Sequence, residues 1–484
     1  MTNSVTELIR FYNSPFSYWC NKTNQLVDEK KIDKKYKIDI NNSKLISKQL
    51  LEKAEEHEII LKDKFRISEN LDVVDMSNKE SSNRTFLNEL DKKPDIIFQP
   101  FLKSKNFVGR LDFVKVFNTE FHIIDAKLSS SIKKNHILQL CAYKELLEEV
   151  TGKHVSECFL FLSDLQFHKV DVSDYQKLFI EIKNQFIDFN KMYDPEFPPY
   201  PKKGEELREY DTEAKKIWIN NNGLELLHRI QGRQVEKLQE NNINSVEDLK
   251  NSELENIEGM GSDTFKKYKK LAQLLVDSTE EEILYEIKDS SLNGLLKPTK
   301  GDLYIDFEGY PYLNLNRNFE YLYGIWCLDE SNTFTYFWSD NEDEEMRSFI
   351  SFMEHLFNHL KSFPNAKFYH YFSYEITSLR KSAQTFKIYE SELEKLIEEE
   401  YFVDLFKTVN SSLLLGTSSY SLKTVEKVAG ISRDEELQSG MESIRYFEDY
   451  FFNEEYELKD LIIEYNKADC KNLFLLHEWL AKLL

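Results

Sequence analysis

Three consecutive strand-like segments between residues 301 and 340 restrict the fold of this chain more than any other feature. They are rich in aromatic and β-branched residues, and they are followed by a helical pattern at 343–362, another strand-like segment and several more helical patterns. This order of elements predicts a mixed α/β domain. Pro298 and Gly301 precede the first strand, so we place this domain at residues 299–484.

Two pairs of polar residues in this region have spacings that suit a metal site. Asp306 and Glu308 lie two residues apart in a strand, so their carboxylates share one face while the residues between and beside them face a core. Tyr465 and Asp469 lie four apart in a helical pattern and also share one face. Because carboxylates on an inner strand repel each other, they become favourable when a divalent cation bridges them.

The motifs DFE (306–308) and YNKAD (465–469) resemble the first and third motifs of the DEDD exonuclease superfamily, in its tyrosine-containing branch, which has an RNase H-like fold. The resemblance implies hydrolysis from a chain end with 3′ to 5′ polarity, and it implies that Tyr465 orients the attacking water. It also implies four ligands for two Mg²⁺ or Mn²⁺ ions: Asp306, Glu308, Glu375 and Asp469. Glu375 departs from the superfamily, whose third acid is usually Asp.

Each of these residues also has an interpretation that involves no catalytic role. An Asp-x-Glu sequence arises by chance in an acidic chain, and the C-terminal helix and strand order are what favour catalysis here. Asp404, in YFVDLFKTV, matches a position that often follows the second motif of the DEDD superfamily, and we expect it to have a structural role. His370, on a strand beside aromatic residues, is expected to be a core histidine rather than a ligand.

Residues 1–200 show a different order of elements. A helical run at 46–65 precedes short strand-like segments from Ile96 onward, and Asn118-Thr119 has the character of a hairpin turn. A helix at about 135–149 and a further strand follow. Helix, antiparallel strands, helix and strand predict an α/β sandwich.

Charged residues in this region are placed for metal-assisted hydrolysis. Asp125 and Lys127 share a strand face, Asp112 lies on the neighbouring strand, and Glu58 lies on the preceding helix. Acids of this kind hold a divalent cation, while a lysine positions water and stabilises developing negative charge.

The motifs SPFSYWC, HE, GRLD, DAK and QLCAY, in that order over residues 10–165, resemble the RecB-like branch of the PD-(D/E)XK nucleases. The resemblance implies that Glu58, Asp112 and Asp125 bind one or two Mg²⁺ or Mn²⁺ ions. It implies catalytic roles for Lys127, Gln139 and Tyr143. The alternative is a folded relic of such a domain that retains polar residues. Some members carry an iron–sulfur cluster; here only Cys20 matches, so we expect no cluster and a structural Cys20.

A polar, almost wholly helical segment at 201–298 is predicted to connect the two domains, after the prolines at 198, 199 and 201. Part of it has helix–hairpin–helix character, with Gly259 and Gly261 in the turn and Lys266 and Lys267 in the following helix. Such hairpins bind DNA phosphates through backbone amides, although an ordinary turn remains an alternative. The whole order resembles a bacterial family of RecB-like nucleases with a helical connector and a C-terminal exonuclease domain.

Composition sets further limits. The net charge of −22 argues against non-specific nucleic-acid binding, but it averages over lysine-rich patches and acidic metal sites. Five scattered cysteines without a CxxC pair indicate a reducing compartment, and no signal peptide or membrane-spanning stretch is evident, so we expect a cytoplasmic protein.

We therefore expect a nuclease that acts on DNA, at single-stranded ends, with RNA as the alternative substrate. The chain lacks a GxxxxGK[ST] loop, so any dependence on ATP would come from a helicase or a repair or defence partner. The competing hypothesis is a catalytically weak or inactive scaffold that binds nucleic acid within such a complex; Glu375 and the net charge favour it.

Overall fold

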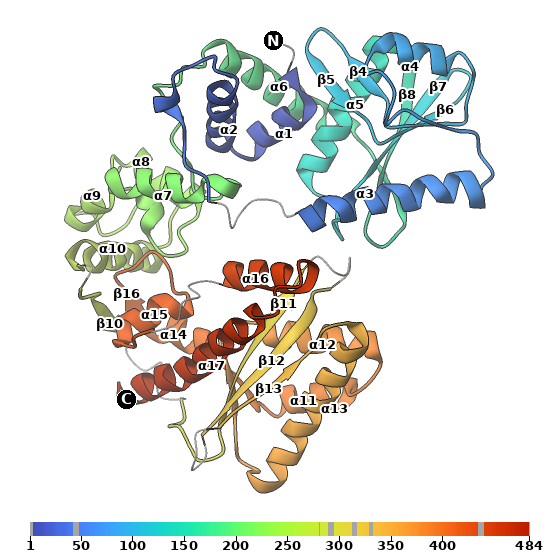
Figure 1. Cartoon of the computed structure of the whole chain (residues 1–484). Helices are drawn as coiled ribbons and strands as arrows, with labels where there is room; N and C mark the ends of the chain where they lie inside the picture. The colour runs from blue at the N-terminus through green and yellow to red at the C-terminus, as the bar shows by residue number, and fades with distance from the viewer. Residues whose placement is uncertain are drawn as a thin grey trace. The chain divides into compact units, whose positions relative to one another are not determined.

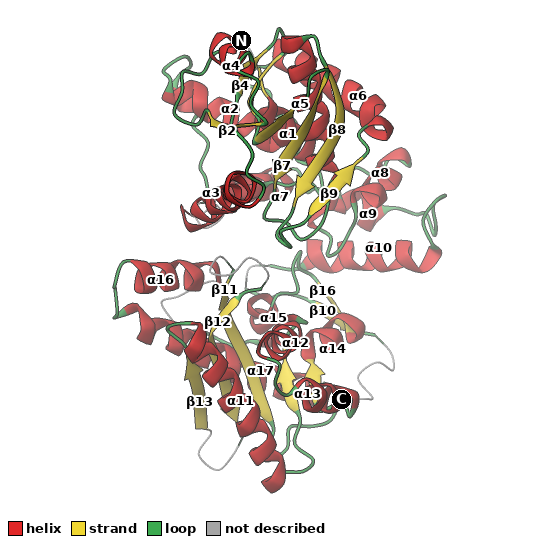
Figure 2. Cartoon of the chain, turned by 90° about the vertical axis from the view of Figure 1, so that its right-hand side faces the viewer, coloured by secondary structure: helices red, strands yellow, loops and turns green. Residues whose placement is uncertain are grey.

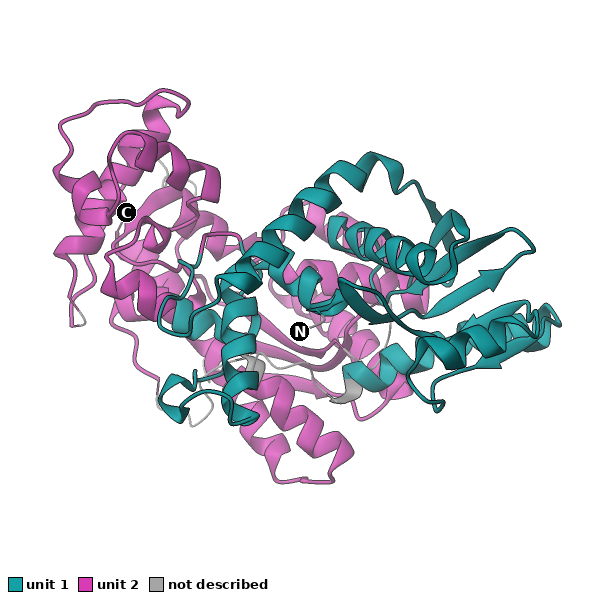
Figure 3. Ribbon diagram, turned by 90° about the horizontal axis from the view of Figure 1, so that it is seen from above, with its two compact units in different colours: residues 1–201, 205–214 teal, residues 202–204, 215–484 magenta. Residues whose placement is uncertain are grey.

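The computed structural model describes residues 3–41, 48–279, 281–288, 295–311, 317–328, 333–433 and 440–483. The chain forms two compact units (Figures 1 and 3). The N-terminal unit comprises Met1–Pro201 with Glu205–Ala214, and the C-terminal unit comprises Lys202–Gly204 with Lys215–Leu484. Each unit contains helices and a main β-sheet (Figure 2).

The main sheet of the N-terminal unit has six strands. Their spatial order is β2 (Val73–Asp75), β3 (Ile96–Phe98), β6 (Phe113–Val116), β7 (Glu120–Ala126), β8 (His154–Phe161) and β9 (Phe167–Val170). Strands β3, β6 and β7 are antiparallel, and β7 and β8 are parallel. The expected turn at Asn118-Thr119 joins β6 to β7, so this prediction is confirmed. A small second sheet has the order β1 (Asn3–Ser4), β5 (Phe107–Arg110) and β4 (Phe101–Lys103).

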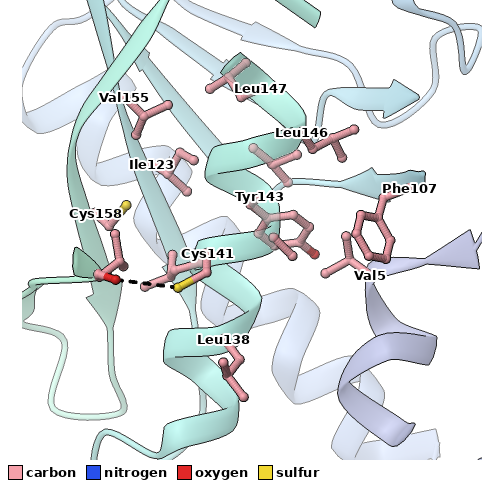
Figure 4. Close-up of a cluster of buried hydrophobic side chains, with 14 of the residues drawn as sticks. Val5, Phe107, Ile123, Leu138, Cys141, Tyr143, Leu146, Leu147, Val155 and Cys158 are labelled. Carbon is pink, nitrogen blue, oxygen red and sulfur yellow. Dashed lines mark hydrogen bonds between the residues drawn. The ribbon is translucent and has the colours of Figure 1, made fainter. Parts of the chain in front are cut away.

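Six α-helices are described in this unit: α1 (Val5–Asn13), α2 (Pro15–Asp28), α3 (Lys48–Asp63), α4 (Asn83–Leu90), α5 (Lys134–Thr151) and α6 (Gln176–Lys191). The central one is α5, whose apolar side chains pack against β7, β8 and α1. Figure 4 shows Tyr143 and Leu146 of α5 directed toward Val5 and Phe107. Gly109 permits this approach, because a Cβ there would lie 3.0 Å from the Tyr143 ring. Each buried side chain of this size contributes about 1.5–3 kcal/mol.

The helical segment expected as a connector contains α7 (Asp211–Asn220), α8 (Gly232–Glu240), α9 (Val246–Asn251) and α10 (Ser262–Asp277). Helices α8 to α10 pack around a core that also includes Leu414. One strand, β10 (Tyr285–Ile287), pairs with β16 (Leu413–Leu415) and was not expected. A three-residue strand whose partner lies far away in the sequence leaves no periodic pattern to detect.

The main sheet of the C-terminal unit has five strands, in the order β13 (Thr333–Trp338), β12 (Phe319–Cys327), β11 (Leu303–Tyr310), β14 (Phe368–His370) and β15 (Phe402–Asp404). The first three strands in the sequence form an antiparallel meander, while β14 and β15 run parallel to β11. The three consecutive strands predicted from the sequence are therefore confirmed.

Helices cover both faces of this sheet. The first group consists of α11 (Glu342–Ser362), α12 (Tyr374–Phe386) and α13 (Glu390–Glu398); the second consists of α14 (Leu405–Ser412), α15 (Leu422–Ala429), α16 (Gly440–Phe452) and α17 (Leu458–Lys482). Ile305 and Phe307 pack against the first group, and Tyr304 packs against α17. The predicted alternation along β11 is thus confirmed. Helix α17 runs along β11 and β12 (Figure 1).

Candidate metal centre

Three carboxylates converge where α17 passes over β11. Asp306 and Glu308 come from the strand and Asp469 from the helix, and one oxygen of each lies within 4.8 Å of the others. Oxygen ligands at about 2.1–2.5 Å from one cation lie roughly 3–5 Å apart, so this group has the dimensions of a site for a divalent cation. It is the one such group found among the described residues.

Burial and mutual repulsion act together on these acids. Burial raises the pKa of Asp306, and the charges of Asp469 and Glu308 raise it further. Burial, followed by the charge of Asp469, raises the pKa of Glu308 to about 8. Burial also raises the pKa of Asp469, against the opposing effects of Arg433 and then Lys423. A divalent cation would relieve this repulsion, so the donor set fits Mg²⁺ or Mn²⁺.

Asn466 holds Asp306 in place, a contact that the sequence analysis missed. Its amide nitrogen donates to the Asp306 main-chain oxygen at 3.0 Å and to Oδ2 at 2.8 Å. Gly324 lies opposite Asp306 on β12, and a Cβ there would lie 1.7 Å from the Asn466 side chain. An Asn one residue after the motif tyrosine, on a helix with buried acids, was the signal in the sequence.

Tyr465 lies beside Asp469, as the four-residue spacing predicts. Its side chain is buried, and the Lys423 ammonium lies 4.7 Å from the centre of its ring. Burial raises the pKa of the phenol, as do the charges of Asp469 and Glu308. The phenol therefore stays neutral at ordinary pH and is able to donate a hydrogen bond.

Glu308 has a neighbour of its own on β12. The Tyr321 hydroxyl lies 3.3 Å from Glu308 Oε2, to which it donates, and 2.9 Å from the Ser443 hydroxyl. All three residues are buried. The sequence contained no signal for this contact, because Ser443 comes from α16 and Tyr321 is one of many aromatic residues on the strands.

Glu375, the third predicted acid, lies outside the group of three. It is buried in the first turn of α12, and its Oε2 lies 3.4 Å from Nδ1 of His370 on β14. Its charge still acts on Asp306, whose pKa it raises. His370 is a buried histidine, as expected, with an acidic neighbour that the sequence did not indicate. Asp404 caps α14 by accepting from the Phe406 amide at 3.0 Å, which agrees with its expected structural role.

The strand order, the position of α17 over the sheet and the three converging acids agree with the comparison to known families. Residues 303–481 match the family model of the RNase_H superfamily. This region is an RNase H-like domain, which indicates a nuclease-type hydrolase. RNase H-like nucleases generally use Mg²⁺ or Mn²⁺. No curated protein matches the chain. Within the described part of the chain, no helix is long and apolar enough to span a membrane.

Outside the RNase H-like domain, the N-terminal unit brings its predicted charges together around an ion pair. Lys127 Nζ lies 2.6 Å from Asp125 Oδ2, and the carboxylate is fully buried. Asp112 accepts from the Ala126 amide at 2.7 Å, and Glu58 accepts from the Gln99 side chain at 2.7 Å. No sequence motif indicated the contact between Gln99 and Glu58.

The pKa shifts show that these groups interact. Burial, then the charge of Asp125, raises the pKa of Asp112 well above its usual value. Burial disfavours the charged form of Lys127, but the attraction of Asp125 and Asp112 outweighs it and raises the pKa of the ammonium. Glu58, Asp112 and Asp125 nevertheless do not form a group of ligand atoms as close as that of the RNase H-like domain.

Gln139 and Tyr143 meet on one face of α5, as their spacing predicts. The Gln139 amide nitrogen donates to the Tyr143 hydroxyl at 3.0 Å. Burial raises the pKa of Tyr143, and so do the charges of Asp125 and Asp112, which places the phenol near the acids. Tyr143 also belongs to the apolar core in Figure 4.

The predicted hairpin joins α9 to α10. Gly259 has a φ of 79°, which favours glycine, and Gly261 caps the N-terminus of α10. Lys266 is exposed, whereas Lys267 is half-buried, and burial followed by the charge of Arg229 lowers its pKa. Binding of nucleic acid by these residues stays a prediction.

Proposed function

We propose that this chain is a metal-dependent nuclease whose RNase H-like domain removes nucleotides from single-stranded DNA ends, with 3′ to 5′ polarity. The convergence of Asp306, Glu308 and Asp469 in one buried group carries the proposal. The substrate and the polarity rest on the resemblance of the DFE and YNKAD motifs to the tyrosine-containing DEDD exonucleases. RNA remains the alternative substrate.

Each residue has a distinct task in this proposal. Asp306, Glu308 and Asp469 would hold Mg²⁺ or Mn²⁺, with Glu375 completing the set for a second ion. When bound, such ions activate water and stabilise the charge on the leaving oxygen. Tyr465, a neutral phenol beside Asp469, would orient the attacking water. Asn466 would orient the Asp306 carboxylate through its hydrogen bond to Oδ2, while its second hydrogen bond goes to the main-chain oxygen of Asp306.

A second nuclease site in the N-terminal unit forms part of the proposal. Its support is the order α3, antiparallel β3, β6 and β7, then α5 and the parallel strand β8, which agrees with the RecB-like PD-(D/E)XK resemblance. Asp112, Asp125 and Glu58 would bind one or two ions, and Lys127 would stabilise negative charge at the phosphate. Gln139 and Tyr143 would line the site from α5.

We assign residues 1–200 and 299–484 to the two nuclease domains and 201–298 to the helical connector. The connector hairpin would bind the DNA backbone through the amides after Gly261, with Lys266 nearby.

A non-catalytic scaffold is the second candidate. The observation that favours it is the wider spread of Glu58, Asp112 and Asp125, together with the pairing of Glu375 to His370. Under this alternative the chain would bind nucleic acid in the presence of Mn²⁺ without cleaving it.

End-labelled single-stranded DNA tests the proposal. Purified protein is incubated with Mn²⁺ and an oligonucleotide that carries a label at either its 5′ or its 3′ end. We expect a ladder of shortening products from the 5′-labelled strand and immediate release of labelled mononucleotide from the 3′-labelled strand. Asp306→Asn should remove both products. Glu398→Gln, an exposed acid on α13, is the matched control and should leave them unchanged.

Two other outcomes have clear meanings. A wild-type protein that binds DNA and matched RNA but cleaves neither would support the scaffold and contradict the nuclease. Cleavage that survives Asp306→Asn and disappears with Asp125→Asn would assign the activity to the N-terminal site alone.

A further inference from the structure

Arg433 forms an ion pair with Asp469, one of the three acids of the carboxylate group in the RNase H-like domain. It follows α15, and its Nη2 lies 2.5 Å from Oδ1 of Asp469. The side chain of Arg433 is 10% exposed. None of the motifs in the sequence pointed to this residue.

Glu426 holds the guanidinium in a fixed orientation. Its two oxygens accept from Nε and from Nη2 of Arg433, the latter at 2.6 Å, and its own side chain is only 1% exposed. A fork-to-fork pair of this kind fixes the plane of the guanidinium as well as its position. Because a buried ion pair is weak evidence for a role in stability, its presence beside a metal-binding group calls for another explanation.

Among the described residues, nothing pairs with the Nη1 nitrogen of this guanidinium. Arg433 Nη1 is buried, and within the part of the chain that the structure describes it has no hydrogen-bond partner. Buried donors of folded proteins are nearly always paired, so an unpaired one beside a candidate active site indicates a ligand. The ligand must be an acceptor that lies next to Asp469, and it must tolerate a fixed planar donor.

The surrounding charges indicate an anion. Lys423, on α15, lies against the Tyr465 ring, and its charge opposes the rise in the pKa of Asp469 that burial causes. Lys423 and Arg433 thus place two cations on the α15 side, facing acids that come from β11 and α17. A cation bound by Asp469 would share the negative charge that Arg433 now neutralises, so more of the positive charge of the guanidinium would act on an anion beside Nη1.

We propose that Arg433 is a phosphate-binding residue of this site: oriented by Glu426, it donates through Nη1 to a non-bridging oxygen of the phosphate held beside Asp469. This inference rests on the proposed function, which supplies the phosphate. Glu426 is a positioning residue, because it acts only through Arg433. Guanidinium groups suit this task since they remain charged and offer donors in a fixed plane.

Binding measurements on the full chain test the inference. Mn²⁺ alone and thymidine 5′-monophosphate in the presence of Mn²⁺ are titrated by calorimetry into wild type, Arg433→Gln, Arg433→Lys and Glu426→Gln. Arg433→Gln should weaken nucleotide binding by about 10- to 100-fold, the range of a charge-assisted hydrogen bond. Its affinity for Mn²⁺ should stay equal or increase, because Asp469 loses a competing cation.

The two remaining variants separate positioning from charge. Glu426→Gln should weaken nucleotide binding by about tenfold, since the guanidinium loses its orientation but keeps its charge. Arg433→Lys keeps the charge opposite Glu426, so it remains usable if Arg433→Gln fails to fold, and it should bind nucleotide with intermediate affinity. In DNA-cleavage assays the loss should appear in KM as well as in kcat.

Three results would overturn the inference. In the first, wild type binds no nucleotide with Mn²⁺ present. In the second, Arg433→Gln or Arg433→Lys binds nucleotide as wild type does while its Mn²⁺ affinity rises, which would make Arg433 only a counter-ion for Asp469. In the third, Mn²⁺ and nucleotide affinity fall together with the melting temperature, as for a purely structural residue.

The result also stands apart from the test of nuclease activity. Arg433-dependent nucleotide binding by a protein that cuts no DNA would refute the proposed function and support this inference. DNA cleavage that is unaffected by Arg433→Gln would do the reverse.

Discussion

The acids of the N-terminal unit and those of the RNase H-like domain are paired with cations that come from different parts of the chain. In the N-terminal unit the cation is Lys127, which lies two residues from its partner Asp125 on the same segment. In the RNase H-like domain it is Arg433, which reaches Asp469 from a segment after α15. Three acids converge within 4.8 Å only in the second case, among the described residues. One cation from the same segment faces the spread acids of the N-terminal unit, whereas the close group, even with Arg433 beside Asp469, has the dimensions of a site for a divalent cation.

The largest expected effect would separate the two sites by activity. Asp306→Asn should reduce the rate of end trimming by about 1000-fold or more, because metal coordination contributes several kcal/mol to the barrier. Asp125→Asn should leave the ladder from end trimming intact and alter only products formed elsewhere on the strand. Gel analysis of 5′-labelled single-stranded DNA checks both, and equal losses in the two variants would contradict the assignment of separate sites.

The two sites should also contribute unequally to the stabilisation of the protein by metal binding. Mn²⁺ at 100 times its dissociation constant should stabilise the folded protein by about 2.7 kcal/mol. We expect Asp306→Asn to abolish most of the increase in melting temperature and Asp125→Asn to abolish little of it. Thermal unfolding with and without Mn²⁺, with Glu398→Gln as control, provides the measurement. If millimolar Mn²⁺ leaves the melting temperature of the wild-type protein unchanged, the result would argue against a metal at either site.

Lys127 is expected to stabilise the N-terminal unit by opposing the repulsion between its acids. Lys127→Met leaves Glu58, Asp112 and Asp125 without the cation that opposes their repulsion, so the free energy of unfolding should fall by about 2 kcal/mol. This value is smaller than for a fully buried ion pair, because the Lys127 side chain is 23% exposed and solvent screens its charge. Hydrogen exchange at the amides of β7 reports the loss locally, and Lys105→Met, at an exposed position, is the control. Unchanged exchange rates would show that solvent already screens these acids.

The smallest effect concerns the amides that orient the acids. Asn466→Ala should slow end trimming by about tenfold, the usual consequence of losing a hydrogen bond to a metal ligand. Gln99→Ala, which removes the donor to Glu58, should leave end trimming unchanged. Initial rates of nucleotide release measure both, with Asn358→Ala as an exposed control. A full-rate Asn466→Ala variant would mean that Asp306 needs no such support.

Local patterns predicted a large part of this protein. The two-residue spacing of Asp306 and Glu308 placed them on the face of β11 opposite Ile305 and Phe307. The four-residue spacing of Tyr465 and Asp469 placed both on the same side of α17, and that of Gln139 and Tyr143 was enough for a hydrogen bond. These predictions succeed because strand and helix periods are properties of the backbone alone.

Contacts between distant segments could not be predicted in this way. Examples are the pairing of β10 with β16, the insertion of Asn466 against Gly324, and the approach of Arg433 to Asp469. Residue spacing was enough to predict which residues share a face of each helix and strand. Which faces meet, and which charges lie beside the acids, depends on the fold, because packing between elements requires complementary shape and burial of surfaces far apart in the chain.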